Sequence, residues 1–411
     1  MTLKIQTLYN IDVFGVLHQT KVLKMRIIYF TTATTKEDYV SFSSAWDSSL
    51  NTSIQNLHNR LIRSLGLTHE VEVISIRPFS RKYCHLKMLE AETKQEGKIT
   101  WHYLQIKRSK LSRNMAIKSQ CKKILSKTNL KDCIVITDTL NPNVLFNAIT
   151  CAKRFNLPII GVCNNTPSNI HNTGRSYTTS LLGKAADLSG YITLTPGLNL
   201  LFNKSNRANM SFEGILDDVS PKNQKNEYGK YIFFNGSLEE KYGVYELIKA
   251  FRELDHPDIN LVISGYHANP NKMNEAIGGK SNIISLGMIQ SDEIVSLANQ
   301  SLLNINPCPY SEDFDRYFIP DNLVDYFNAN AVMVSVRNRQ FKKYFEQDAI
   351  WIQSNEVYDL LKGIKAGLNL SKEERANMIK KANIDSSKLY SMAMINHRTI
   401  LFLKQFLKQK D

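Results

Sequence analysis

Residues 231–251 read Tyr-Ile-Phe-Phe-Asn-Gly-Ser-Leu-Glu-Glu-Lys-Tyr-Gly-Val-Tyr-Glu-Leu-Ile-Lys-Ala-Phe. The apolar run at the start ends in Asn235-Gly236-Ser237, and from Val244 to Phe251 apolar residues recur at the spacing of one helical face. A strand that feeds a glycine turn and a helix start can hold a phosphate, because glycine lets the backbone come close and the helix N-terminus is positive. The stretch therefore predicts a strand–turn–helix unit of a parallel α/β fold, with an anion site at the turn.

The composition indicates a globular protein of about two domains. The chain has 411 residues, and domains usually have about 100–200. A hydrophobic content of 43% and a charged content of 22% allow each domain a packed core. No apolar run approaches the ~18 residues that a membrane helix needs. Asp12 and His18 interrupt the apolar patch near the start, which argues against a signal peptide. Residues 25–30 have the pattern of a first strand, so residues 1–24 are interpreted as an N-terminal extension or as a misassigned start.

The six cysteines and the positive charge bear on location and partners. No pair of cysteines is spaced C-x-x-C, which favours reduced, structural cysteines in a cytoplasmic protein. The positive charge of the chain is concentrated in one segment. The net charge is +14, and residues 98–131 hold ten Lys or Arg and no acid. This basic segment has two open interpretations: a solvated helix face, or a face that adsorbs to an anionic membrane surface. Aromatic residues are not interleaved with the basic ones beyond Trp101 and Tyr103, so we expect no nucleic-acid partner.

Short apolar strands alternate with amphipathic helices along the chain, which predicts parallel sheets covered on both faces. In the first half we expect strands at 25–31, 71–77, 99–106, 132–138, 158–163 and 190–194, and helices at 52–65, 110–128, 142–155 and 176–187. In the second half we expect strands at 230–235, 259–264, 282–286, 302–306 and 331–336.

The same pattern predicts the domain organisation. Residues 25–213 form an N-terminal Rossmann-like domain, and the polar segment 214–230, with Pro and Gly, forms the linker. Residues 231–390 form a second domain, and a helix within 391–411 is expected to pack back towards the first. Two doubly wound domains joined by a linker face each other across a cleft at the carboxyl ends of their strands, where such sheets bind ligands.

Four pieces of the second half follow in a distinctive order. They are the turn at Gly236-Ser237 with Lys241, the strand Leu261-Val-Ile-Ser-Gly265, the segment Asn282-Ile-Ile-Ser-Leu-Gly-Met-Ile289, and Leu303-Asn-Ile-Asn-Pro-Cys-Pro309 followed by Tyr317-Phe-Ile-Pro-Asp-Asn-Leu-Val-Asp-Tyr-Phe327. Over about residues 230–336 their order and spacing resemble the donor domain of GT-B glycosyltransferases of family four. These are retaining transferases that use nucleotide-sugar donors. The first half resembles the family more loosely.

The resemblance implies a nucleotide-sugar site in the second domain. Its donor-binding residues would be Gly236, Ser237, Gly265, Gly287, Met288, Asp321 and Asn322. Lys241 would neutralise charge as the nucleotide leaves, and Asp325 would accept hydrogen bonds from the ribose hydroxyls. Such enzymes need no metal and no cofactor, because basic side chains and helix ends stabilise the charge. A UDP-sugar is the expected donor.

Several positions depart from the family pattern. Ser237, Cys308 and Asn322 stand where the family has cations, Tyr317 replaces a glutamate, and Asp325 is shorter than the glutamate it matches. Lys241 and Arg316 are then the cations available to compensate. Two hypotheses stay open. One is a cytoplasmic transferase that acts on a saccharide or lipid-linked glycan, in cell-surface polysaccharide or glycoconjugate synthesis at the inner membrane face. The other is a GT-B protein without catalysis that serves as partner subunit of another glycosyltransferase.

Three residues of the first half are candidates for the acceptor side. Asp138 follows an expected buried strand, and it either faces the cleft or caps the next helix. Asn164 ends another strand, at a position where family members often carry an acid. His171 lies in the polar loop that follows, and it either contacts the acceptor or is simply solvated.

Overall fold

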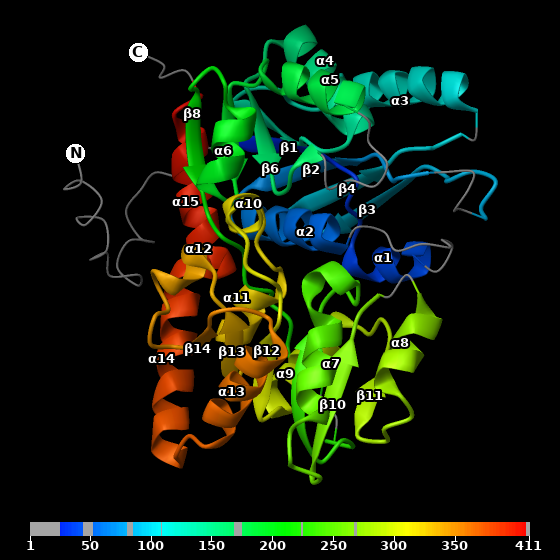
Figure 1. Ribbon diagram of the computed structural model, residues 1–411. Helices are drawn as coiled ribbons and strands as arrows, with labels where there is room; N and C mark the ends of the chain where they lie inside the picture. The colour runs from blue at the N-terminus through cyan, green and yellow to red at the C-terminus, as the bar shows by residue number, and fades with distance from the viewer. Residues whose placement is uncertain are drawn as a thin grey trace.

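The computed structural model describes residues 25–43, 52–79, 85–107, 109–167, 175–222, 225–266 and 269–407. Its strands form two sheets, one of eight strands and one of six, each flanked by helices (Figure 1). The fold is the two-sheet α/β arrangement that the sequence predicts. The expected extension 1–24 lies outside the described residues.

The eight-stranded sheet has the order β3-β4-β2-β1-β5-β6-β7-β8. Its strands are β1 (Arg26–Thr31), β2 (Glu70–Ser75), β3 (Glu92–Glu96), β4 (Ile99–Tyr103), β5 (Cys133–Asp138), β6 (Ile159–Cys163), β7 (Gly190–Thr193) and β8 (Ala208–Ser211). Its helices are α1 (Lys36–Ser43), α2 (Thr52–Gly66), α3 (Lys110–Leu125), α4 (Pro142–Phe155), α5 (Arg175–Ala185) and α6 (Pro196–Phe202). All neighbouring strands are parallel except β3 and β4.

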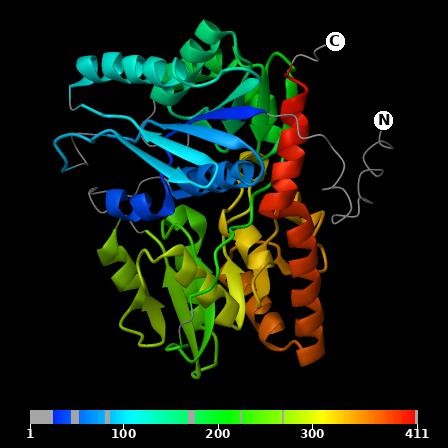
Figure 2. The same cartoon turned by 180° about the vertical axis from the view of Figure 1, so that it is seen from behind.

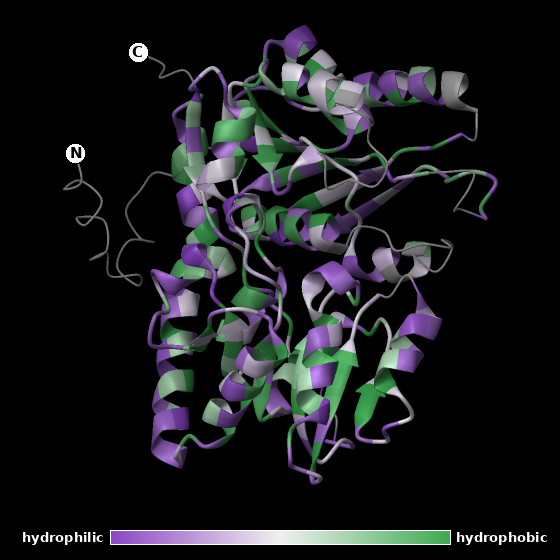
Figure 3. Cartoon of the chain, in the orientation of Figure 1, coloured by the Kyte–Doolittle hydropathy of each residue, from purple (hydrophilic) through white to green (hydrophobic). Residues whose placement is uncertain are grey.

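The six-stranded sheet has the order β11-β10-β9-β12-β13-β14, with every neighbouring pair parallel. Its strands are β9 (Lys230–Asn235), β10 (Ile259–Ser264), β11 (Ile283–Ser285), β12 (Leu303–Asn306), β13 (Val332–Val336) and β14 (Ile350–Ile352). Its helices are the 3-10 turn η4 (Glu240–Tyr242), α7 (Val244–Arg252), α8 (Pro270–Ile277), α9 (Ser291–Gln300), α10 (Glu312–Tyr317), α11 (Asn322–Phe327), α12 (Arg339–Lys342), α13 (Val357–Leu368) and α14 (Lys372–Tyr390). Figure 3 shows green, apolar strands between helices that carry the purple, polar residues.

The last two helices run along one side of both domains (Figure 2). Helix α14 packs on the C-terminal domain, and α15 (Met392–Lys404) follows it onto the N-terminal domain. Ser64 donates to the carbonyl of Met392, and Asn396 donates back to the carbonyl of Ser64 at 2.6 Å. The C-terminal helix is therefore a strap across the two domains.

A polar hairpin is the main element that the sequence pattern did not predict. Strand β3 carries the sequence Glu-Thr-Lys-Gln-Glu, which lacks the apolar alternation of a buried strand. It pairs antiparallel to β4 through a turn at Gly97, whose φ is +58°. A glycine between two short runs is typical of a hairpin turn and could have indicated this one. The strand expected at 99–106 ends at Tyr103, and the helix expected at 110–128 ends at Leu125.

The basic segment 98–131 contains α3, which lies on the outer side of the N-terminal domain (Figure 1). The apolar residues Ile117, Cys121 and Leu125 are buried against the domain. The exposed face carries the lysines Lys118, Lys122 and Lys123, and the exposed Lys127 follows directly after the end of the helix. Within the described residues, no helix is long and apolar enough to cross a membrane.

Candidate active site

Three glycines hold the ends of β9, β10 and β11 together. Gly236 donates its backbone N–H to the carbonyl of Ser264 at 3.0 Å, and Gly265 donates to the carbonyl of Gly287 at 2.7 Å. Gly265 has a φ of +139°, and a Cβ on it would lie 1.7 Å from the carbonyl oxygen of Gly236. Only glycine fits such an approach of two backbones. The turn predicted from residues 231–251 is thus packed directly against the next strand end.

Helix α11 is attached to the same turn. The Asn322 side chain donates to the carbonyl of Asn235 at 2.9 Å, and the N–H of Asn235 donates to the Tyr326 hydroxyl at 2.7 Å. Ser264 donates to the Asn235 side chain at 2.9 Å. Asn322 is buried, so it holds the turn in place rather than offering a free group. Ser237, next to the turn, is partly exposed.

Lys241 and Arg316 are both exposed, as a role at an anionic ligand requires. Lys241 pairs with Glu239, with 3.1 Å from Nζ to Oε2, and 54% of its side chain remains exposed. Arg316 lies on α10 and forms no ion pair with any residue that the structure describes. Tyr242, beside Lys241, packs against Phe314 and Phe318 of the α10 segment, with ring centroids 6.2 and 5.8 Å apart. The two segments therefore lie side by side.

Two further arginines lie at the carboxyl end of β13. The guanidinium carbon of Arg337 is 4.2 Å from the ring centroid of Tyr310, and that of Arg339 is 5.7 Å from it. Tyr310 follows β12, two residues after Cys308, the position where the family has an arginine. Our sequence reasoning missed both arginines. Their place directly after the strand expected at 331–336 is the signal that could have found them.

Gly287 and Met288 follow β11. Gly287 has a φ of +66°, and a Cβ added to it would meet no atom within 4 Å. The next residue, Met288, is 48% exposed. The backbone here is therefore accessible, as contact with a flat ring such as a base would require.

Asp325 contacts the N-terminal domain. Arg60 of α2 donates from Nη1 to Oδ1 at 3.0 Å and from Nη2 to Oδ2 at 2.7 Å. Arg60 also donates to the carbonyl of Ile215, in the segment between the domains, at 2.8 Å. Burial opposes the charge of Arg60, but the carboxylates of Asp325 and Asp217 outweigh it and raise its pKa. The carboxylate expected to bind ribose is thus held by a two-pronged ion pair between the domains.

Asp217 is the centre of this junction. Lys36 donates to both of its oxygens at 2.6 and 2.7 Å, Arg63 donates at 2.9 Å, and Arg60 Nε lies 3.6 Å away. Burial would raise the pKa of the Asp217 carboxyl, but the three cations outweigh burial and lower it. We call Lys36, Arg60, Arg63, Asp217 and Asp325 the junction cluster.

Asp321 lies at the N-terminus of α11, beside the junction cluster. Its side chain makes no capping hydrogen bond to the helix. It accepts a hydrogen bond from Ser53 of α2 at 2.7 Å. Partial loss of hydration next to the protein, together with the nearby Asp325 carboxylate, raises the pKa of Asp321 to about 6, and the hydrogen bond from Ser53 and the charge of Arg60 oppose this shift. Solvent still reaches this side chain.

Asp138 and Asn164 lie behind the carboxyl edge of the N-terminal sheet. Only 1% of Asp138 is exposed, and its Oδ1 accepts from the N–H of Leu140 at 2.8 Å. It neither faces solvent nor caps the next helix, because Asn141 supplies that cap. Asn164 is 5% exposed, and its amide has no hydrogen-bond partner among the described residues. His171 lies outside the described residues.

In the described part of the chain, no cluster of three or more His, Cys, Asp or Glu could hold a metal ion. The described cysteines Cys121, Cys133, Cys151, Cys163 and Cys308 are buried and unpaired.

Residues 217–385 match the family of glycosyl transferases group 1. The C-terminal domain is a group 1 glycosyltransferase domain. The matched segment contains the glycine turns, Lys241, Asp325 and the arginines after β13. This domain places the chain among transferases.

Solved structures show that the whole chain has the GT-B fold. It superposes on sucrose-phosphate synthase from Thermosynechococcus elongatus with a TM-score of 0.64 and 11% identity, covering 93% of this chain and 98% of that one. The E. coli structure described as trehalose-6-phosphate bound with UDP-2-fluoro glucose superposes with a TM-score of 0.65 and 12% identity, covering 93% of this chain and 100% of that one. The UDP-forming trehalose-phosphate synthase from Burkholderia xenovorans superposes with a TM-score of 0.64 and 10% identity, covering 94% of this chain and 100% of that one. No curated protein sequence matches the chain.

Proposed function

We propose that this group 1 glycosyltransferase is a retaining enzyme that moves a sugar from a UDP-sugar to a saccharide or lipid-linked glycan. The observation that carries the proposal is the turn at Gly236 and Gly265, packed beside the start of α11 inside the matched segment. The similar E. coli structure holds a UDP-sugar analogue, which favours UDP as the nucleotide. Synthesis of a cell-surface polysaccharide or glycoconjugate in the cytoplasm is the proposed setting.

The side chains around the turn have the chemistry that such a transfer needs. The donor's leaving group is a nucleoside diphosphate, so negative charge grows on it as the glycosidic bond breaks. Lys241 is an exposed cation shortly after the turn, Arg316 is an exposed cation on α10, and Arg337 adds a third beside Tyr310. Preorganised cations of this kind stabilise developing charge. In a retaining transfer the donor phosphate can itself take the acceptor proton, so no separate protein base is required.

The first experiment measures nucleotide binding by the full chain. Saturating UDP should raise the melting temperature by several degrees, because a ligand at 100 times its Kd stabilises by about 2.7 kcal/mol. GDP and ADP should raise the melting temperature less than UDP does. If none of the three nucleotides raises the melting temperature and UDP-sugars are not hydrolysed, the proposal is contradicted.

A pair of variants tests the role of Asp325. Asp325→Ala and Arg60→Ala break the same ion pair, but only the first removes the carboxylate. If Asp325 binds ribose, UDP binding weakens about tenfold or more in Asp325→Ala, as expected for loss of a charged hydrogen-bond acceptor. Arg60→Ala should keep UDP binding. Equal effects of both variants would assign Asp325 to the domain junction alone.

A second candidate function is that of a partner subunit without catalysis. It is favoured by two ion pairs: Asp325 is held by Arg60, and Lys241 by Glu239. Copurification with a glycosyltransferase encoded nearby, together with an absence of UDP-sugar hydrolysis by the isolated chain, would support it. Hydrolysis by the isolated chain that depends on Lys241 would exclude it.

We further propose that the exposed lysines of α3 bind an anionic membrane surface. Each basic residue near such a surface adds about 1 kcal/mol. The chain should float with vesicles that contain phosphatidylglycerol and not with pure phosphatidylcholine. Replacing Lys118, Lys122, Lys123 and Lys127 by Gln should abolish flotation and leave the UDP response unchanged. Flotation that survives the four substitutions contradicts the assignment to α3.

A further inference from the structure

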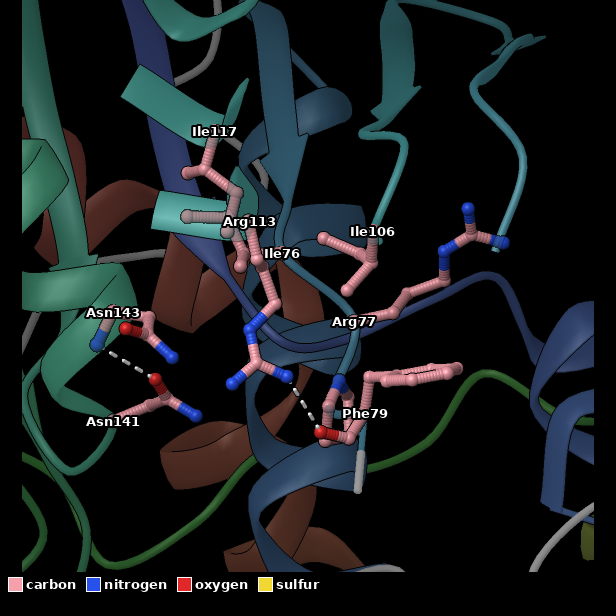
Figure 4. Close-up of a pocket in the computed structure, with 9 residues that line it drawn as sticks. Ile76, Arg77, Phe79, Ile106, Arg113, Ile117, Asn141 and Asn143 are labelled. Atoms are coloured by element: carbon pink, nitrogen blue, oxygen red, sulfur yellow. Dashed lines mark hydrogen bonds between the residues drawn. The ribbon is translucent and has the colours of Figure 1, made fainter. Parts of the chain in front are cut away.

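A cavity of about 210 Å³ lies in the N-terminal domain, apart from the residues assigned to the donor (Figure 4). It forms where three strands of the eight-stranded sheet end. Ile76 directly follows β2, Ile106 follows β4, and Asn141 follows β5. Open α/β sheets bind ligands just outside the carboxyl ends of their strands. The cavity therefore occupies a position where this domain is expected to take a ligand.

The cavity is lined by apolar side chains together with basic ones. Ile76, Ile106 and Ile117 supply apolar surface, and Phe79 supplies an aromatic ring. The charged lining residues are Arg77 and Arg113, and the described lining residues include no acid. The electrostatic potential of such a cavity favours an anion.

Arg113 is the residue whose hydrogen bonds are incomplete. Its Nη1 donates to the carbonyl of Phe79 at 3.1 Å, which fixes the guanidinium. Its Nε is buried and has no partner in the described part of the chain. A buried donor without a partner is uncommon in native proteins and calls for an explanation. Figure 4 shows the guanidinium between Phe79 and the side chains of Asn141 and Asn143.

Arg77 has a different role. Figure 4 shows its guanidinium directed away from that of Arg113. Its Nη2 donates to the backbone carbonyls of Glu90 and Leu104, and the guanidinium carbon lies 4.8 Å from the ring centroid of Tyr103. Arg77 therefore forms part of the wall and adds positive charge, while Arg113 is placed to contact a ligand.

We propose that this cavity binds the oxyanion of an acidic sugar in the acceptor, either a carboxylate or a phosphate monoester. The proposal rests on the transferase function proposed above. With Nη1 occupied, the Nε–Nη2 edge of Arg113 matches two oxygens of one oxyanion, which is the paired geometry that arginine prefers. The volume is below the 300–1,000 Å³ of typical ligand pockets. It therefore suits one sugar unit, with its apolar face against Phe79.

The test measures binding of three matched sugars to the full chain by saturation-transfer NMR and calorimetry. Glucuronate, glucose 6-phosphate and glucose differ only in the group at C6. At least one acidic sugar should bind about tenfold or more tightly than glucose, as expected for a charged hydrogen-bonded pair. The tighter of the two identifies the oxyanion. Equal binding of glucose, or binding of none of the three, overturns the proposal.

Two substitutions on α3 locate the binding. Arg113→Gln should weaken the acidic sugar about tenfold or more. Lys118→Gln removes the same charge from an exposed position five residues away on the same helix and should have little effect. Equal weakening by both would show non-specific attraction and overturn the proposal. Arg113→Lys, which keeps the charge but loses the paired geometry, should give an intermediate loss.

Substitution of Arg113 could weaken binding by disturbing the segment around Phe79, to which it donates a hydrogen bond. Asn143→Asp tests the location of the site while keeping Arg113 in place. Asn143 is exposed in the first turn of α4, where an acidic residue favours the helix. The new carboxylate should weaken the acidic sugar about tenfold through repulsion and leave glucose unaffected. Unchanged binding of the acidic sugar contradicts the location.

Nucleotide binding separates this inference from the proposed function. Arg113→Gln should leave the UDP-dependent rise in melting temperature unchanged. Acidic-sugar binding without any UDP response would defeat the transferase proposal and keep the cavity assignment. A UDP response without acidic-sugar binding would defeat only the cavity assignment.

Discussion

The strand-end turns of the C-terminal domain and the junction cluster between the domains are held together by different forces. At the turns, Gly265 lies directly against the backbone of Gly236 and donates a hydrogen bond to Gly287, while Gly236 donates to Ser264. At the junction, charged side chains meet across two domains, with Arg60 and Asp217 at the centre. Asp325 matches the donor site by sequence and belongs to the junction by contact. The difference shows that close backbone packing defines the turn at Gly236, while ion pairs link the two domains at the junction cluster.

The largest loss of stability is expected from a substitution of Gly265, where the neighbouring backbone leaves no room for a Cβ atom. In Gly265→Ala the new Cβ would meet the carbonyl oxygen of Gly236, so either the strand ends separate or the domain fails to fold. We expect a loss of about 3 kcal/mol or more in the free energy of unfolding, measured by urea denaturation.

Gly287→Ala is the matched control, because its φ is also positive but a Cβ there meets nothing within 4 Å. It should cost about 1 kcal/mol. Similar losses in the two variants would mean that backbone conformation, and not close packing, governs the turn.

The junction should lose stability next. Arg60→Ala leaves the largely buried Asp325 without its ion-pair partner, while Asp217 keeps Lys36 and Arg63. We expect a loss of about 2–4 kcal/mol, near the range for breaking a buried ion pair, seen as a lower thermal midpoint. Lys153→Ala breaks the exposed pair with Asp187 and should cost less than about 1 kcal/mol. Equal midpoints would show that the junction cluster contributes no more than a surface pair.

Lys241 tests whether the turn also depends on charge. Lys241→Ala should lower UDP-sugar hydrolysis about 10²-fold, the usual effect of removing one charge-stabilising group, with little change in unfolding. Lys249→Ala, on the exposed side of α7, is the control and should keep full activity. Activity retained in Lys241→Ala would shift the assignment to Arg316 or Arg337.

The smallest effect concerns Asp321 and pH. Its folded pKa of about 6 exceeds the unfolded value of about 3.9, so the folded state binds the extra proton. Its stabilising contribution is complete below about pH 4 and falls as the pH rises through 6. Asp321→Asn should therefore match the wild type at pH 4 and be slightly more stable at pH 7, by about 0.5 kcal/mol or less because solvent reaches the site. Greater stability of the wild type at pH 7 would contradict this sign.

Much of the fold could be predicted because it depends on local patterns. Apolar runs and helical spacing located most strands and helices of both sheets. The hairpin of β3 escaped because its residues are polar and its strand lies at the edge of the sheet. The strand–turn–helix unit at Gly236 could be predicted for the same local reason: a glycine that ends a buried strand is close in sequence to the helix that follows it.

The amino-acid sequence by itself determined the alternating α/β architecture, the glycine turns and the positive charge of α3. Those features follow from residues close to one another in the chain. Only the tertiary structure decided that Asp325 pairs with Arg60, 265 residues away, and that Asp138 is buried. It also placed Arg113 against Phe79 in a cavity. The physical reason is that a charge or a buried amide takes its role from the groups that folding brings near it, and residue spacing carries no record of those groups.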